Sequence, residues 1–175
     1  MVANALAFDI KETTTRLSDS LRTIEWAVSL VPEQWTHRLP EHYPADAWSV
    51  AMNIAHLVTY EEGLAAPMLE ALAAGCDGTD VVASADERLA DAVAIADQPL
   101  DALMARLRSA RGRQIEVVKD FPAERFSAPL TPLWGRHYPL YGDHLHSAGW
   151  VASKTFQHTW EHGNAILRVA LYAPR

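Results

Sequence analysis

The chain has 175 residues, of which 49% are hydrophobic and 21% charged, and its formal net charge is −7. We expect one globular domain over residues 1–175. The negative charge argues against nucleic acid and anionic membranes as partners. We therefore expect no nucleic acid and no membrane partner, whereas the charge says little about small-molecule substrates. One cysteine, Cys76, excludes an intramolecular disulfide and fits a reducing, cytoplasmic location.

Two helices are predicted in the first half of the chain. The first runs from about Asp9 to Val31, with apolar positions at heptad spacing, and Pro32 ends it. An irregular connection leads to a second helix, for which Ser49 is the predicted N-cap and Gly75 the end. Pro67 is expected to bend this helix. Its inward-facing positions include His56 and Glu61, two polar residues among apolar neighbours.

A linker with its own short helix, ending near Ile95, precedes a third long helix at about Leu100–Phe121. Arg111 and Gln114 fall on inward heptad positions of this helix. A buried arginine needs an anionic partner. Arg111 therefore pairs with an inward carboxylate such as Glu61 or Glu25, or faces a cavity and binds an anionic ligand, or extends its head into water.

Residues 122–149 are predicted to be a long irregular excursion, rich in tryptophan, tyrosine, histidine and glycine. Long loops in compact domains are often functional, so we expect a lid or a pocket rim here. Three histidines of this loop, His137, His144 and His146, are not predicted to be metal ligands.

The last helix, Trp150–Tyr172, carries the most informative pattern. Its apolar seam includes Val151, Thr155 and Val169, but its two central positions are His158 and His162. Two histidines four residues apart lie on one face of a helix and suit binding of one divalent metal ion. The alternative is a pair of core histidines that bond to neighbours. His56, buried on the second helix, is the predicted third ligand.

The same residues, His158-Thr-Trp-Glu161-His162, also spell the H-x-x-E-H motif of inverted zinc proteases. That chemistry needs an acidic ligand further along the chain. No Asp or Glu follows His162, so a protease is not expected.

Two segments together resemble the DinB-like (YfiT-like) superfamily. The first is Trp48-Ser-Val-Ala-Met-Asn-Ile-Ala-His56-Leu, followed by acidic residues, and the second is His158-Thr-Trp-Glu161-His162. The resemblance implies an all-α four-helix bundle in up-down-down-up order, with a long loop before the last helix. It also implies a nickel or zinc ion bound by His56, His158 and His162, and a homodimer.

Some members of that superfamily are metal-dependent S-transferases that use bacillithiol or mycothiol, and others are described only as stress-inducible. The expected function is therefore transfer of a low-molecular-weight thiol to an electrophilic small molecule. Glu161 or Glu62 would orient a ligand histidine or take a proton, and Arg111 and Thr155 are candidate cofactor-binding residues. A metal-dependent hydrolase and a non-catalytic stress-response bundle with a vestigial metal site are the alternatives.

Overall fold

The computed structural model describes residues 7–44, 47–76, 85–128 and 147–173. Within these ranges every regular element is helical, which confirms the predicted all-α class. The elements are α1 (Ile10–Ser29), the 3-10 turn η1 (Glu33–Trp35), α2 (Val50–Tyr60), the π-helical turn η2 (Glu61–Ala65), α3 (Ala66–Ala73), α4 (Ala85–Ile95), α5 (Leu100–Lys119), α6 (Ala123–Phe126) and α7 (Ala148–Tyr172).

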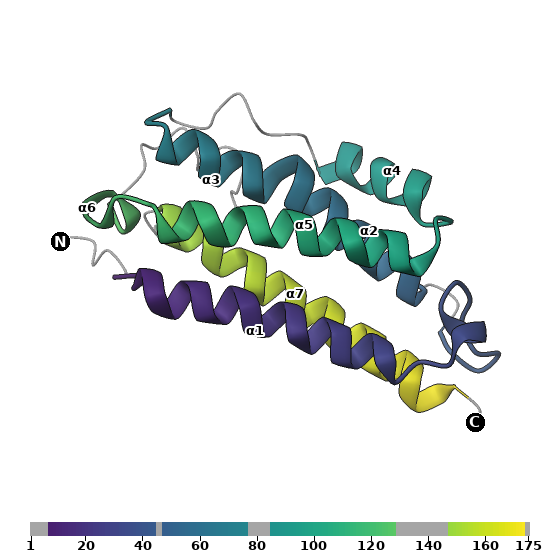
Figure 1. The fold of residues 1–175 in the computed structure, drawn as a ribbon. Coiled ribbons are helices and arrows are strands. Elements are labelled where there is room, and N and C mark those ends of the chain that lie inside the picture. Colours follow the sequence, from purple (N-terminus) through teal and green to yellow (C-terminus); the bar gives the residue numbers. More distant parts are fainter. Residues whose placement is uncertain (1–6, 45–46, 77–84, 129–146, 174–175) are drawn as a thin grey trace, which may run out of the picture.

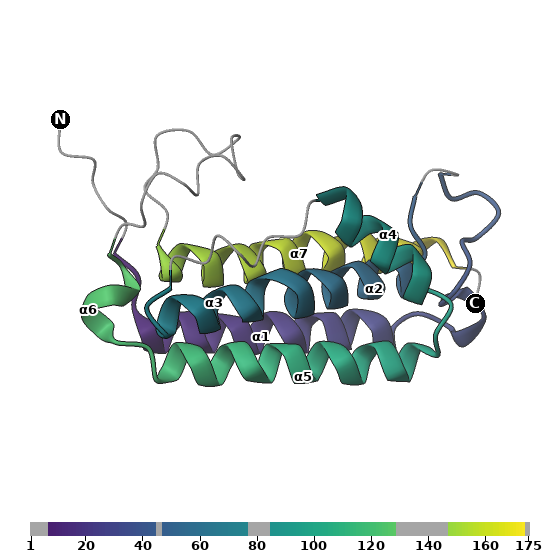
Figure 2. The same cartoon turned by 90° about the horizontal axis from the view of Figure 1, so that it is seen from above.

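Four rods form the bundle: α1, the continuous rod α2–η2–α3, α5 and α7. Helices α1 and α7 run in one direction, and α2–α3 and α5 run in the other, which confirms the up-down-down-up order (Figure 1). Each of α1 and α2 packs against both α5 and α7. Helix α4 lies outside the bundle beside α2 (Figure 2).

Local sequence explains where the helices begin. The Asp9 side chain accepts a hydrogen bond from the Glu12 N–H and caps α1. Ser49 caps α2 as predicted, by accepting from the Met52 N–H at 3.1 Å. These side-chain oxygens satisfy N–H groups that have no partner within the helix.

The second rod contains a π-helical turn, Glu61–Ala65, just before Pro67. The Ala66 N–H donates to the Glu61 carbonyl, five residues earlier. Proline has no N–H to offer to the preceding turn, and a wider turn accommodates that loss. At the far end, Gly75 adopts a positive φ of 90°, a conformation that glycine allows without strain and that ends α3.

A layer of polar side chains divides the core into two apolar clusters. One cluster includes Ile24, Ile54 and Leu107, and the other includes Leu17 and Leu64. On each rod the two clusters are separated by buried polar residues at the same level. These are Ser20 on α1, Glu61 on η2, Arg111 and Gln114 on α5, and Thr155 and Thr159 on α7.

The segment before the last helix differs from the prediction of an irregular excursion over residues 122–149. A short helix, α6, follows Pro122, and its fully buried Phe126 anchors it to the core. Helix α7 begins at Ala148, with Ser147 as its N-cap. The segment predicted to form a lid or a pocket rim, with the loop histidines His137, His144 and His146, lies largely outside the described residues. Within the described ranges, no helix is both long and apolar enough to cross a bilayer.

Candidate metal centre

His56 from α2 and His158 and His162 from α7 converge on one point; we call them the histidine cluster. The Nε2 atom of His158 lies 3.2 Å from Nε2 of His56 and 3.1 Å from Nε2 of His162. One ligand atom from each ring lies within 4.8 Å of the others. The two short separations suit nitrogen ligands that each lie about 2.1 Å from one ion.

The protonation of the ring nitrogens also fits a metal ion bound between the three histidines. His162 Nδ1 lies 2.7 Å from the side-chain oxygen of Asn53, which can only accept. Nδ1 of His162 therefore carries the proton, and Nε2 of the same ring has a free lone pair. A proton on His158 Nε2 can satisfy only one of its two short contacts. A cation between the three rings would satisfy every lone pair at once, so the donor set fits a divalent metal.

All three rings are held neutral. Burial lowers the pKa of His158 to about 2, and the neighbouring His162 and His56 add to that shift. Burial, followed by the charge of His56, lowers the pKa of His162 to about 4. Burial and the Arg88 charge lower the pKa of His56. Neutral imidazoles are the form that binds metal, so the cluster needs no deprotonation at neutral pH.

Two aromatic rings pack against the histidine cluster. The Trp48 ring stacks on His162, with centroids 5.8 Å apart and planes 14° apart, and meets His56 edge-on at 5.0 Å. The Tyr60 ring packs on His158 at 4.5 Å. These contacts hold the imidazole planes, while the three histidines remain partly exposed.

Asn53 was not predicted from the sequence as a site residue. It lies three residues before His56, on the same face of α2, and only 2% of its surface is exposed. A buried asparagine within an apolar helix, one turn from a candidate ligand, was the available signal.

Neither of the two predicted catalytic carboxylates contacts a histidine of the cluster. Glu161 is exposed on α7 and makes no hydrogen bond or ion pair to any residue that the structure describes. Glu62 forms a two-point ion pair with Arg106 of α5, at 2.6 and 3.1 Å. Within the described residues the hydrogen-bond partner of a cluster histidine is an amide rather than a carboxylate.

Arg111 is the centre of a second polar group, which we call the arginine network. Its guanidinium bonds to both carboxylate oxygens of Glu61. Its remaining N–H groups donate to the Leu17 carbonyl at 2.6 Å, to Ser20 Oγ at 2.7 Å and to Thr159 Oγ1 at 2.8 Å. Gln114 donates to Glu61 at 2.7 Å and accepts from Thr155 at 3.0 Å.

This geometry decides between the alternatives for Arg111. Glu61 is its partner, whereas Glu25 pairs with Arg108 at 2.6 Å. All five donors of Arg111 have acceptors inside the protein, so none is left for an anionic ligand. Thr155 is fully buried and bonded to Gln114. The cofactor-binding roles predicted for Arg111 and Thr155 are therefore replaced by structural ones.

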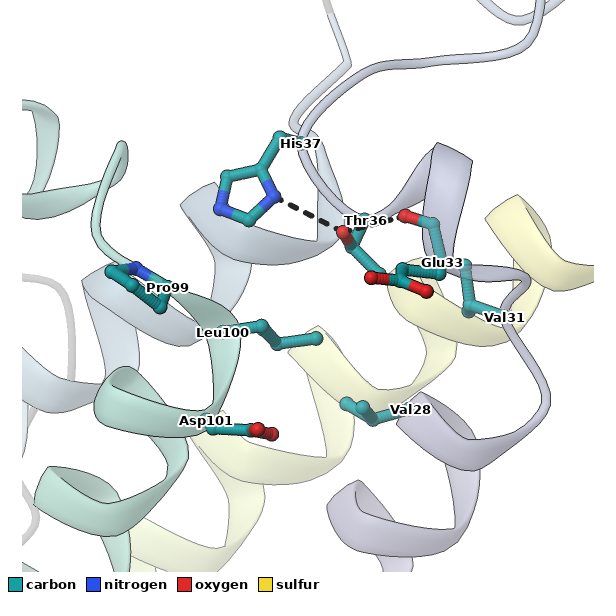
Figure 3. A pocket seen from close by; sticks show the side chains of 8 residues that line it. All are labelled: Val28, Val31, Glu33, Thr36, His37, Pro99, Leu100 and Asp101. Carbon is teal, nitrogen blue, oxygen red and sulfur yellow. Dashed lines mark hydrogen bonds between the residues drawn. The ribbon is translucent and has the colours of Figure 1, made fainter.

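A separate pocket of about 520 Å³ lies at the end of the bundle, between the end of α1 and the start of α5 (Figure 3). His37 at its rim contacts the Gln98 carbonyl at 3.0 Å through Nε2 and the Thr36 hydroxyl at 3.1 Å through Nδ1. Since a carbonyl only accepts, Nε2 carries the proton. His37 thus connects two loops and is not part of the histidine cluster.

Comparison with known proteins agrees with this architecture. A family model described as DinB superfamily matches residues 16–166. The chain belongs to the DinB superfamily. No curated protein matches the chain at a significant level.

Solved structures share the fold of this DinB-superfamily chain at low sequence identity. A mycothiol-dependent maleylpyruvate isomerase matches with a TM-score of 0.69 at 14% identity, over 90% of this chain and 60% of that chain. The present chain thus spans less than two thirds of the isomerase. An uncharacterised protein from Escherichia coli UTI89 matches with a TM-score of 0.69 at 11% identity, over 95% of each chain.

A third neighbour corrects the prediction about partners. The colibactin self-resistance protein ClbS, solved in complex with double-stranded DNA, matches with a TM-score of 0.61 at 13% identity, over 91% of this chain and 92% of that chain. A protein of this fold can therefore bind nucleic acid. The prediction that excluded a nucleic-acid partner on the basis of the net charge was wrong. Net charge sums over the whole chain, whereas a local surface sets contact with DNA.

Proposed function

We propose that this chain binds one divalent metal ion through His56, His158 and His162 and uses it in thiol chemistry on an electrophilic small molecule. The main support for this proposal is that three neutral imidazoles converge, with Nε2 separations of 3.1 and 3.2 Å. Three protein ligands leave coordination positions open, which is typical of catalytic rather than structural metal sites. Nickel and zinc are the candidate ions, since imidazole suits both.

The chemistry that such an ion supplies is acidification of a bound thiol, which yields a thiolate nucleophile at neutral pH. The histidines would hold the ion, and being neutral they leave its positive charge uncompensated. That charge favours an anionic ligand such as a thiolate. Trp48 and Tyr60 fix the orientation of the rings that they contact. The superfamily membership and a neighbour described as mycothiol-dependent support a low-molecular-weight thiol as co-substrate.

A thiol-consumption assay tests this proposal. The untagged protein, loaded with zinc or nickel, would be mixed with mycothiol or bacillithiol and a set of small electrophiles. We expect metal-dependent loss of free thiol with formation of the thioether, and no such loss with the His158→Ala variant. Metal-dependent cleavage of small esters without thiol consumption would instead support a hydrolase. Metal binding without either reaction would contradict a catalytic role.

A further inference from the structure

Asn53 makes three side-chain contacts that together fix its orientation. Its Nδ2 atom donates to the Ser49 carbonyl at 2.9 Å and to the Trp48 carbonyl at 3.2 Å. Carbonyls only accept, so the amide nitrogen must face them. The Oδ1 atom then faces His162, with Nδ1 of that ring at 2.7 Å. The hydrogen-bond pattern leaves no alternative in which the amide is flipped.

This orientation decides the state of the His162 ring. Because Oδ1 can only accept, His162 Nδ1 must carry the proton, and the Nε2 lone pair then points toward His158. The other two rings have no such device, since Nδ1 of His56 and of His158 is buried without a hydrogen-bond partner among the described residues. Asn53 therefore distinguishes His162 from its two neighbours.

Asn53 also connects the His162 ring to Trp48, the aromatic residue that stacks on it. The Trp48 ring stacks parallel to His162, and the Trp48 carbonyl is one of the two acceptors of Asn53. One buried amide thus fixes the His162 proton from one side and contacts the backbone of the residue that covers the ring. Groups that bond to the outer nitrogen of a ligand histidine orient it and tune its affinity for metal.

We propose that Asn53 is a positioning residue of the metal centre, which holds His162 as the Nδ1–H tautomer with Nε2 ready to bind the ion. This inference rests on the proposed metal site. Because an amide is neutral, Asn53 orients the ring without adding a negative charge beside it. A carboxylate at the same place would increase the basicity of the ligand and offset part of the metal charge.

The test compares three variants with the wild-type chain. Asn53→Leu keeps the approximate size but removes the acceptor. Asn53→Asp keeps an acceptor for His162, loses the donors to Trp48 and Ser49, and adds a carboxylate charge beside the ring. Thr59→Val is the matched control, because Thr59 is a buried residue of the same helix whose hydroxyl bonds to the His56 and Arg88 carbonyls and to no imidazole.

Nitrogen NMR of the metal-free protein gives the first readout, since it distinguishes a protonated imidazole nitrogen from a lone pair. We expect the Nδ1–H form of His162 in the wild type, in Thr59→Val and in Asn53→Asp. Asn53→Leu should show a mixture that includes the Nε2–H form. Wild-type His162 protonated on Nε2, or an unchanged tautomer in Asn53→Leu, would overturn the proposal.

Zinc affinity, measured by competition with a chelating dye, gives the second readout. We expect Asn53→Leu to bind zinc roughly 10- to 100-fold more weakly than the wild type, a range typical of such outer partners. Thr59→Val should bind as the wild type does, and Asn53→Asp should recover most of the loss. Equal affinity of Asn53→Leu and wild type would overturn the positioning role. A wild-type chain that binds no metal would refute the proposed function, whereas the tautomer result would still report on the Asn53 contact.

Discussion

The bundle holds two groups of buried polar side chains that differ in how their hydrogen-bonding capacity is met. In the arginine network every donor of Arg111 has an acceptor, and the network draws on all four rods. In the histidine cluster three Nε2 atoms face one another, and two outer nitrogens have no partner among the described residues. A satisfied buried group stabilises one packing of the helices, whereas a convergent, unsatisfied group provides a place for a ligand.

Breaking the arginine network should produce the largest effect on stability. Arg111→Met leaves the Glu61 carboxylate buried without its partner, because both side chains are completely buried. We expect a loss of about 3–5 kcal/mol in the free energy of unfolding, measured by urea denaturation. Arg113→Met on the same helix breaks an exposed pair with Glu70 and should cost less than about 1 kcal/mol. Similar losses in the two variants would contradict the structural role of the network.

Adding metal should stabilise the chain only through the histidine cluster. A ligand that binds the folded state alone, at a free concentration of 100 times its dissociation constant, raises the free energy of unfolding by about 2.7 kcal/mol. We expect such a shift with zinc or nickel for the wild type and none for His158→Ala. Denaturation with and without metal measures it, and an equal shift in both proteins would assign the binding to another site.

The same variant should show little change in metal-free stability. His158→Ala loses packing, but it also removes a buried ring whose polar groups are not satisfied, and the two effects oppose each other. We expect the free energy of unfolding of the metal-free protein to change by no more than about 1 kcal/mol. A loss as large as that for Arg111→Met would mean that the histidines are a structural group after all.

The smallest effects are expected for the carboxylates outside the cluster. Glu62 is partly exposed and paired with Arg106, and Glu161 is exposed. Glu62→Gln and Glu161→Gln should each change stability by less than about 1 kcal/mol, and zinc affinity should not change. Calorimetric titration with zinc measures the second quantity. A marked loss of affinity in either variant would show that its carboxylate acts on a ligand histidine.

Helix periodicity and spacing in the sequence predicted much of this architecture. The heptad positions predicted the four long helices, and Ser49 predicted where one of them begins. The i, i+4 spacing of His158 and His162 predicted that both rings lie on one face. These features are local, so a short stretch of sequence contains the information. The fold order came from the resemblance to the superfamily, since no connection is short enough to determine it.

Contacts between helices account for what the sequence could not decide. The partner of Arg111 was open between Glu61 and Glu25, because both carboxylates lie on inward or flanking positions and only packing selects one. The bond from Asn53 to His162 also depends on side chains that meet across the bundle. Sequence spacing within one helix does not determine such pairings.

The most direct test of the central claim is the metal content of the purified, untagged chain. Mass spectrometric metal analysis of the wild type should give about one divalent ion per chain after loading and dialysis, and His158→Ala should give close to none. Wild-type protein that retains no metal, or a variant that retains as much as the wild type, would contradict a metal centre built from His56, His158 and His162.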